Sequence, residues 1–290
     1  MIRLPTRLWA PSPSLLAKRN FSATAKLAAD HPAVNEINGP VDVDTFRRIA
    51  TAGPERPIVL RSRAVADFRS SDQDATPAPS QGSHDTQFIR FDAPLAFLCA
   101  ALEFNRQQSS PAGRLSQLYI AQALLSDLPH ELQGDVPTPL LLTAPPTQDL
   151  PYSADVYGSS VWIGLESTYT PFHRDPNPNL FCQLYGSKVI RLMPPRSGER
   201  FFRKVMTGLG EFRGSAAIRG EEMMQGAERQ AWLDAVWGSD PPAGMLEVVL
   251  HPRDVLFFHK GWWHSVKSMG ESGDLNASVN WWFRWRKHNH

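Results

Sequence analysis

From Ser159 onward, short apolar segments alternate with turn residues, and this pattern restricts the possible folds more than any other feature of the chain. The segments are rich in β-branched and aromatic residues, and proline, glycine or asparagine separates them. The expected strands are 160–164, 179–185, 188–193, 254–258, 264–267 and 277–283. Many short strands with regular turns are typical of two packed antiparallel sheets. We therefore predict a mainly β fold, a double-stranded β-helix or jelly roll.

Helical patterns accompany these strands. One around 221–237 interrupts them, and we place it in an insertion at 199–247 of a barrel that spans 151–286. Residues 36–150 are expected to form an α/β region that packs on the barrel. Its elements would be helices near 41–49, 94–106 and 121–135, strands at 56–61 and 116–122, and a brief element at 140–142. Residues 70–86 have almost no apolar content, which is typical of a mobile loop.

Composition excludes several classes of protein. Of the 290 residues, 42% are apolar and 20% are charged, as in an ordinary globular domain. The net charge of +1 provides no basic field for DNA, and no apolar segment is long enough to span a membrane. Cys99 and Cys182 lack the spacing of a Cys-x-x-Cys motif or of a disulfide framework.

The N-terminal segment differs from the rest of the chain. Residues 1–21 contain Arg3, Arg7, Lys18 and Arg19, and the first acidic residue is Asp30. A basic segment without acidic residues predicts a mitochondrial transit peptide, followed by a linker at 22–35, and hence a location in the mitochondrial matrix. The alternative is a disordered cytosolic tail. Removal of the segment would change the net charge from +1 to −3, which makes a nucleic-acid partner less plausible still.

Three residues have the spacing of a metal site. His173 and Asp175 lie two positions apart, so that on a strand both side chains point to one face, and His264 follows much later in the sequence. Two histidines and one carboxylate on one face of an ion suit non-haem Fe(II) and leave coordination positions open. The alternatives are a surface His–Asp hydrogen bond, a core histidine at 264, and His259 or His251 as the third ligand.

Lys188 lies on an expected strand where alternation places it on the same face as Ile190 and Leu192. An ammonium on the inner face of a barrel is costly unless an anion accompanies it. A dicarboxylate cosubstrate would supply that anion. The alternative is that Lys188 faces solvent and Arg191 faces inward.

Residues 170–195 and 254–283 together resemble a jumonji C (cupin-8 type) Fe(II)- and 2-oxoglutarate-dependent oxygenase, and in particular its small protein hydroxylases. The resemblance implies a cupin-like barrel in which Lys188 binds the distal carboxylate of 2-oxoglutarate. It also implies that Thr170 and Tyr119 donate hydroxyl hydrogen bonds to that carboxylate. Asn179 would be a polar anchor beside the cosubstrate, and Asn280 would line the metal pocket.

Two further features bear on the site. The family usually has proline at the position of His259, so this chain either loses a rigid residue in the turn or gains a hydrogen bond beside the distal ligand. Trp281, Trp282 and Trp285 are expected to pack in the core and at the end of the barrel rather than to stack on substrate.

The resemblance implies an enzyme that consumes 2-oxoglutarate and O2, releases succinate and CO2, and hydroxylates a protein side chain. The same chemistry at an N-methyl group would give demethylation, and at a modified nucleoside it would give RNA hydroxylation. Two rivals come from other classes. One is a metal-dependent cupin that does not use 2-oxoglutarate, and the other is a non-catalytic binding module.

Overall fold

The computed structural model describes residues 34–52, 56–61, 89–210, 216–217 and 225–288. The predicted transit peptide at 1–21, most of the predicted linker at 22–35, and the predicted loop at 70–86 lie outside these residues. No helix among the described residues is long and apolar enough to cross a membrane.

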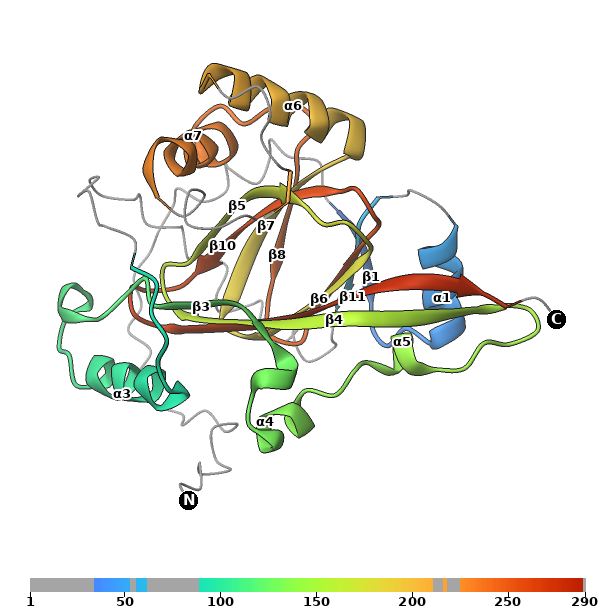
Figure 1. The fold of residues 1–290 in the computed structure, drawn as a ribbon, viewed down its shortest axis with the longest axis horizontal. Helices are drawn as coiled ribbons and strands as arrows, with labels where there is room; N and C mark the ends of the chain where they lie inside the picture. Colours follow the sequence, from blue (N-terminus) through green and yellow to red (C-terminus); the bar gives the residue numbers. More distant parts are fainter. Residues whose placement is uncertain (1–33, 53–55, 62–88, 211–215, 218–224, 289–290) are drawn as a thin grey trace.

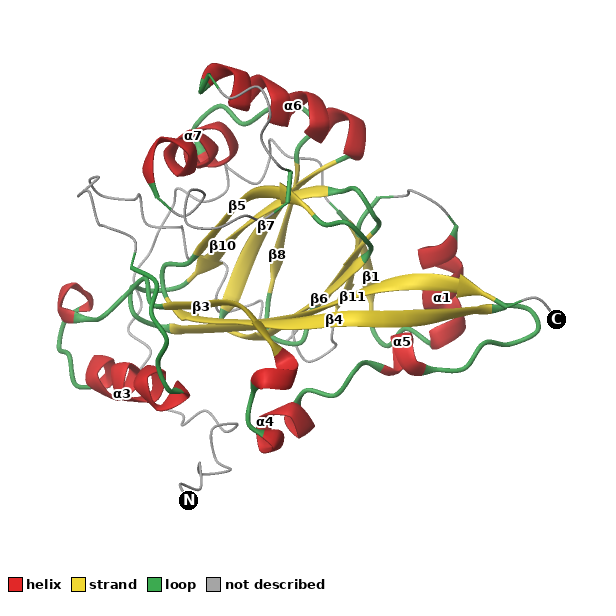
Figure 2. Cartoon of the chain, in the orientation of Figure 1, coloured by secondary structure: helices red, strands yellow, loops and turns green. Residues whose placement is uncertain are grey.

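Two sheets form the body of the molecule, and the predicted jelly roll is confirmed (Figures 1 and 2). The larger sheet has seven strands in the order β1 (Asn35–Asn38), β2 (Ile58–Arg61), β9 (Val255–Phe258), β6 (Asn179–Tyr185), β11 (Leu275–Lys287), β4 (Tyr152–Leu165) and β3 (Tyr119–Leu124). The smaller sheet has four, in the order β5 (Tyr169–Arg174), β10 (Trp263–Met269), β7 (Ser187–Met193) and β8 (Leu246–Leu250). Apolar side chains from both sheets fill the space between them, among them Ile190, Leu192, Leu256 and Phe258.

The observed strands differ from the predicted ones at several places, and β5, which carries His173, was not among the expected strands. β4 and β11 are much longer than the predicted 160–164 and 277–283, because polar and small residues continue their pairing beyond the apolar segments. β1 was not predicted. β8 was also missed, and it begins inside the predicted insertion at 199–247. Its alternation is real, since Leu246, Val248 and Leu250 are buried, but five residues between polar segments give a weak signal.

Helices cover the outer face of each sheet. On the larger sheet lie α1 (Val43–Thr51), whose Phe46 ring packs edge-on against Phe257 at 5.3 Å, and α5 (Leu140–Thr143). The carboxylate of Asp42 caps α1 by accepting from the backbone N–H of Thr45 at 2.9 Å. The structure also describes, in the N-terminal region, α3 (Leu95–Arg106), α4 (His130–Asp135), and the 3-10 turns η2 (Pro111–Gly113) and η3 (Leu125–Asp127).

The smaller sheet is covered by α6 (Pro195–Gly208) and α7 (Gly226–Trp237), whose residues lie largely within the predicted insertion (Figure 1). They pack on β5 and β10 through a stack of aromatic rings in which Phe172 lies 5.3 Å from Trp263 and 5.5 Å from Trp232. Gly198 of α6 lies so close to β10 that a Cβ atom there would be 2.2 Å from the Trp263 ring. The two helices therefore pack against the outer face of β5 and β10, the strands that carry the histidines of the metal site.

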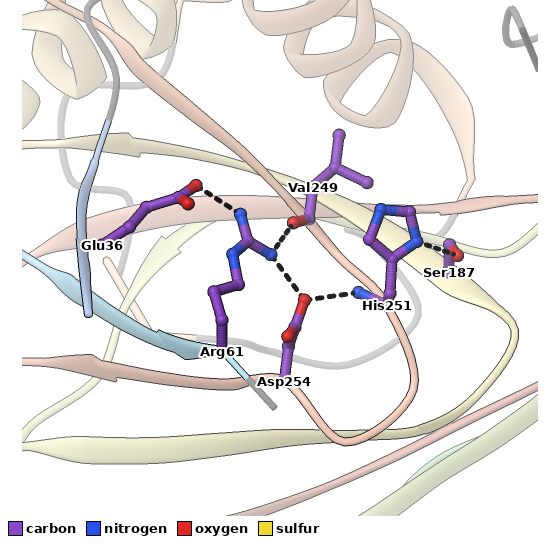
Figure 3. Close-up of polar contacts among 6 residues, drawn as sticks. All are labelled: Glu36, Arg61, Ser187, Val249, His251 and Asp254. Carbon is purple, nitrogen blue, oxygen red and sulfur yellow. Dashed lines mark hydrogen bonds and ion pairs between the residues drawn. The ribbon is translucent and has the colours of Figure 1, made fainter. Parts of the chain in front are cut away.

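A buried ionic network attaches the N-terminal strands to the barrel (Figure 3). The Arg61 guanidinium at the end of β2 donates to Asp254 at 2.5 Å and to the carbonyl of Val249 at 2.7 Å. Its other terminal nitrogen donates to Glu36 of β1 at 2.5 Å. Asp254 also accepts from the backbone N–H of His251 at 2.9 Å, so one arginine joins β1, β2 and the turn between β8 and β9.

Candidate metal and cosubstrate site

Strand pairing brings the three predicted metal ligands together. β5 and β10 are antiparallel neighbours in which His173 pairs directly with His264, and Asp175 follows the end of β5. The Nε2 atoms of His173 and His264 lie 3.7 Å and 3.8 Å from the two carboxylate oxygens of Asp175. All three side chains are buried, and one ligand atom from each lies within 4.8 Å of the others. A single metal ion can therefore contact all three.

The protonation states of these groups also suit a metal. Burial, with a smaller contribution from the neighbouring His173, lowers the pKa of His264 to about 3. Burial likewise lowers the pKa of His173, so both imidazoles are neutral near pH 7. Burial alone would raise the pKa of Asp175, but the two histidines, together with the neighbouring Trp282 and Asn179 side chains, outweigh it and lower that pKa. The three groups therefore present two lone pairs and one negative charge.

Neighbouring groups orient the ligands. The Nδ1 atom of His173 lies 2.8 Å from the carbonyl oxygen of Pro171, which can only accept, so Nδ1 carries the proton and Nε2 is left with its lone pair. The side-chain amide of Asn179 donates to Asp175 at 2.7 Å. The structure thus places Asn179, expected beside the cosubstrate, directly on the metal-binding carboxylate.

Lys188 is fully inside the barrel, at 1% exposure, as its alternation predicts. Its ammonium donates to the hydroxyl of Ser278 at 2.6 Å and lies near the rings of Phe181 and Tyr119. Burial lowers the pKa of Lys188 to about 7, and the carboxylate of Glu166 offsets this only in part. Among the described residues Lys188 forms no ion pair within 4 Å, so the cavity holds a cation that an incoming anion could pair.

The eight predicted site residues all line one cavity between the sheets. Its walls are Tyr119, Trp162, Thr170, His173, Asp175, Asn179, Phe181, Lys188, His264, Val266, Asn280 and Trp282. β10 pairs with β7 so that His264 faces Leu192 while Lys188 faces Ser268, four residues further along. Four residues of strand cover about 13 Å, so the triad and the backbone of Lys188 stand at separated points of the cavity.

The hydroxyl-bearing residues Tyr119 and Thr170 line the same cavity as Lys188. The Tyr119 side chain interacts with the hydroxyls of Thr170 and Thr168, and burial raises the pKa of Tyr119, so it remains a neutral donor. Asn280 accepts a hydrogen bond from the indole N–H of Trp162 at 2.7 Å. Its amide nitrogen makes no hydrogen bond to the described residues and lines the cavity.

Sequence reasoning missed four of the lining residues, Trp162, Phe181, Val266 and Trp282. Trp281 and Trp285 pack in the core on the outer face of the larger sheet, as expected. Trp282 does not, since it lines the cavity and contacts Asp175. The signal was available, because alternation along β11 places position 282 on the same face as Asn280.

The rival histidines lie elsewhere. His259 is buried with its ring 4.8 Å from that of Phe257, and His251 hydrogen-bonds to Ser187 at 3.0 Å. Among the described residues, His173, Asp175 and His264 form the group whose ligand atoms can share one ion. The His259 side chain therefore packs beside Phe257, on the outer face of the larger sheet, and not in the cavity.

A double-stranded β-helix with a His–Asp–His triad and a buried lysine in one cavity defines a class of protein, the metal-dependent oxygenases that use a dicarboxylate cosubstrate. Comparison with known proteins agrees. Residues 61–289 match the model of the cupin-like domain family, and the chain belongs to that family. Its domain is of the jumonji C type that is found in Fe(II)- and 2-oxoglutarate-dependent oxygenases.

Individual relatives are distant. The chain is 24% identical over 183 residues to lysine-specific demethylase JMJ30 of Arabidopsis thaliana, and 27% identical over 177 residues to jumonji C domain-containing protein 5 of Drosophila melanogaster. It is 26% identical over 165 residues to lysine-specific demethylase 8 of Xenopus tropicalis. The matches cover 62%, 61% and 57% of this chain but only 36%, 39% and 32% of those proteins.

The residues present fit the cofactors that this family uses, Fe(II) and 2-oxoglutarate. The donor set of two neutral imidazoles and one carboxylate suits Fe(II), and the buried ammonium of Lys188 suits one carboxylate of 2-oxoglutarate.

Proposed function

We propose that this protein hydroxylates a side chain of another protein and releases succinate and CO2. The observation that carries the proposal is the cavity itself. A buried ammonium without an ion pair shares it with a triad of metal-ligand geometry. An isolated buried charge is destabilising, so its presence is explained best by an anionic ligand that arrives during function.

Each residue has a separate task in this proposal. The protonated amine of Lys188 forms an ion pair with the distal carboxylate of 2-oxoglutarate. The hydroxyls of Tyr119 and Thr170 donate hydrogen bonds to the same carboxylate. Asn179 orients the Asp175 carboxylate by donating a hydrogen bond to it, and Trp282 lies beside that carboxylate. Iron, when bound, supplies the activation of O2. The apolar walls formed by Phe181, Val266 and the tryptophans exclude water from the reacting centre.

Anaerobic visible spectroscopy tests the cosubstrate part. Protein loaded with Fe(II) and titrated with 2-oxoglutarate should develop a metal-to-ligand charge-transfer band. The band should be absent in His173→Ala, which loses a ligand, and should need far more 2-oxoglutarate in Lys188→Ala. Iron binding without a band in the wild type would favour a cupin of different chemistry. Absence of iron binding would favour a non-catalytic module.

Demethylation is the second candidate, since two of the relatives named above are called lysine-specific demethylases. Both reactions oxidise a C–H bond, and they differ in the product. Mass spectrometry of peptide pools after aerobic turnover separates them. Hydroxylation adds one oxygen atom, whereas demethylation removes a methyl group from N-methylated peptides and releases formaldehyde.

We further propose that residues 1–21 direct the protein to the mitochondrial matrix. The support is the four basic residues and the lack of acidic ones in this segment. A fluorescent fusion of residues 1–35 should accumulate in mitochondria, and the same fusion without residues 1–21 should not.

A further inference from the structure

The even-numbered side chains of β11 form a continuous file along the face that lines the cavity. At the inner end Ser278 contacts Lys188, and Asn280 contacts Trp162. Trp282 follows beside the metal carboxylate. Ser278 and Asn280 are almost fully buried, and Trp282 is half-buried, so the file leads from the cosubstrate end of the cavity past the triad toward solvent.

Beyond Trp282 the file continues on a two-stranded ribbon. β6 pairs with β11 as far as Asn179 opposite Trp282, and one further backbone hydrogen bond joins Phe283 to Pro178. Beyond that bond β11 pairs with β4 (Figure 1). The odd-numbered residues Phe283 and Trp285 pack into the core beneath. On the opposite face Arg284 and Arg286 are exposed, and they continue the file from Trp282, which lines the cavity. A substrate that reaches the triad along β11 must cross this face.

Arg284 is the first residue of the file outside the cavity. Its guanidinium lies over the ring of Tyr157, 4.7 Å from the ring centre, and the Tyr157 hydroxyl accepts from Asn177 at 2.9 Å. Arg284 is exposed and forms no ion pair with a described residue. The next residue of the file differs, since Arg286 is paired with Asp155 at 2.7 Å. The aromatic ring thus holds a guanidinium whose N–H donors remain available.

We infer that this exposed face is the docking surface for the polypeptide substrate, and that Arg284 binds an aspartate or glutamate of that substrate. The inference rests on the proposed function and adds to it the class of sequence that is recognised. Trp282 and Arg284 are two residues apart, or about 7 Å along the strand. With the reach of both side chains, the acidic residue would lie roughly two to four positions from the modified residue in an extended peptide.

The charge pattern favours a polypeptide over a nucleic acid. A phosphate backbone is bound by many cations, because each contact releases a counterion. The described face offers one arginine without an ion pair, and its neighbour Arg286 is already neutralised by Asp155. A single planar guanidinium on an aromatic ring suits one carboxylate, to which it can donate two parallel hydrogen bonds.

The test uses the full chain loaded with Fe(II) and 2-oxoglutarate and measures succinate release. The probes are pools of peptides in which one central residue is fixed in turn and either glutamate, alanine or lysine is placed at each flanking position. The wild type should turn over the glutamate pools at least tenfold faster than the lysine pools for acidic positions two to four residues from the centre. Arg284→Glu should reverse the order and favour lysine.

A reversal of preference cannot result from misfolding, since it is a ratio within one enzyme preparation and includes a gain of activity. Arg106→Glu is the matched control. Arg106 is an exposed arginine of α3, at the other side of the molecule from the C-terminal end of β11, and should leave the ratio unchanged (Figure 1).

Three outcomes would overturn the inference. Turnover of peptides with equal rates for the glutamate and lysine pools removes the acidic preference but leaves the proposed function intact. A glutamate preference that persists in Arg284→Glu assigns recognition to another residue. Stimulation by RNA oligonucleotides and by none of the peptide pools removes the proposed function and this inference together.

Discussion

Two buried cations in this molecule have opposite surroundings. Arg61 is in contact with two carboxylates and a carbonyl oxygen, and these outweigh the effect of burial and raise its pKa (Figure 3). Lys188 has a hydroxyl and two aromatic rings as its nearest partners, and burial lowers its pKa to about 7. Both side chains lie between strands of the barrel or at its edge, and both are less than 8% exposed.

The difference separates architecture from function. A buried charge that is paired within the fold offsets much of its desolvation cost there, and removal of one partner is strongly destabilising, so the partners hold strands together. A buried charge that lacks an ion pair has not offset its desolvation cost within the fold, and a ligand must supply the missing interaction. The presence or absence of an ion pair therefore distinguishes a structural buried charge from a ligand-binding one without reference to the family. Four experiments test this criterion.

The largest effect is expected from Arg61→Met. The substitution removes the guanidinium that pairs with Asp254, which is fully buried, and with Glu36. Breaking a buried pair in this way costs about 3–5 kcal/mol of unfolding free energy. Urea denaturation should show this loss, whereas Arg106→Met, which breaks an exposed pair with Glu103, should change stability by less than about 1 kcal/mol. Equal losses in the two variants would mean that the Arg61 network is not structural.

Lys188→Met should preserve or raise the stability of the protein and weaken the binding of 2-oxoglutarate. Because burial lowers the pKa of Lys188 from 10.5 to about 7, protonation of this lysine favours the unfolded chain. The resulting penalty on the folded state is full below about pH 7 and declines to zero as the pH rises to about 10.5. Methionine removes the penalty, so the cosubstrate-free protein should be at least as stable as the wild type at pH 8. Binding of 2-oxoglutarate should weaken by about 2–3 kcal/mol, roughly 30- to 150-fold in Kd. A destabilised Lys188→Met with normal 2-oxoglutarate binding would break the comparison.

The pH dependence of 2-oxoglutarate binding should show the same lysine. Below about pH 7 Lys188 is already protonated in the free protein, so Kd should be constant. Above that pH the lysine must take up a proton as the dianion binds, and Kd should rise by up to tenfold per pH unit. Tyr119, which faces the same ammonium, has a raised pKa and does not titrate in this range. Titrations of the charge-transfer band from about pH 6 to 9 measure the effect, and Lys188→Arg should abolish it, since arginine stays charged.

Much of this site could be predicted from the sequence because its signals are local. Alternation on a strand is enough to place His173 with Asp175 and to turn Lys188 inward. The same rule would have placed Trp282 in the cavity, had it been applied to β11 beyond Asn280. The jelly roll also followed from local patterns, since turn residues bound most of its strands.

The rest depends on contacts between segments that are distant in the sequence. The Arg61 network joins residues separated by 193 positions, and neither Arg61 nor Asp254 lies in a pattern that shows its partner. The edge strand β8 and the ends of β4 and β11 are fixed by pairing with neighbours, not by their own composition. The bulge that places Tyr157 beneath Arg284 is likewise a property of register.

The smallest effect should come from Glu166, the carboxylate that partly offsets the burial of Lys188. It is 1% exposed and accepts from Asn276 at 2.9 Å, a hydrogen bond that glutamine can also accept. Burial raises the pKa of Glu166, while Ser268, Asn276 and Lys188 oppose that rise. Its negative charge stabilises the lysine in the free protein but repels an incoming dianion.

Glu166→Gln should therefore have two effects of opposite direction on 2-oxoglutarate binding. At about pH 6, where Lys188 is protonated in either protein, loss of the repulsion should lower Kd by roughly three- to tenfold. The pH above which Kd rises should move downward, because Lys188 loses the one carboxylate that raises its pKa. Glu271→Gln, an exposed carboxylate paired with Arg114, is the control and should change neither. If Glu166→Gln instead weakened 2-oxoglutarate binding at every pH, Glu166 would be the structural partner of Lys188, as Asp254 is of Arg61. The proposed difference between the two buried cations would then be wrong.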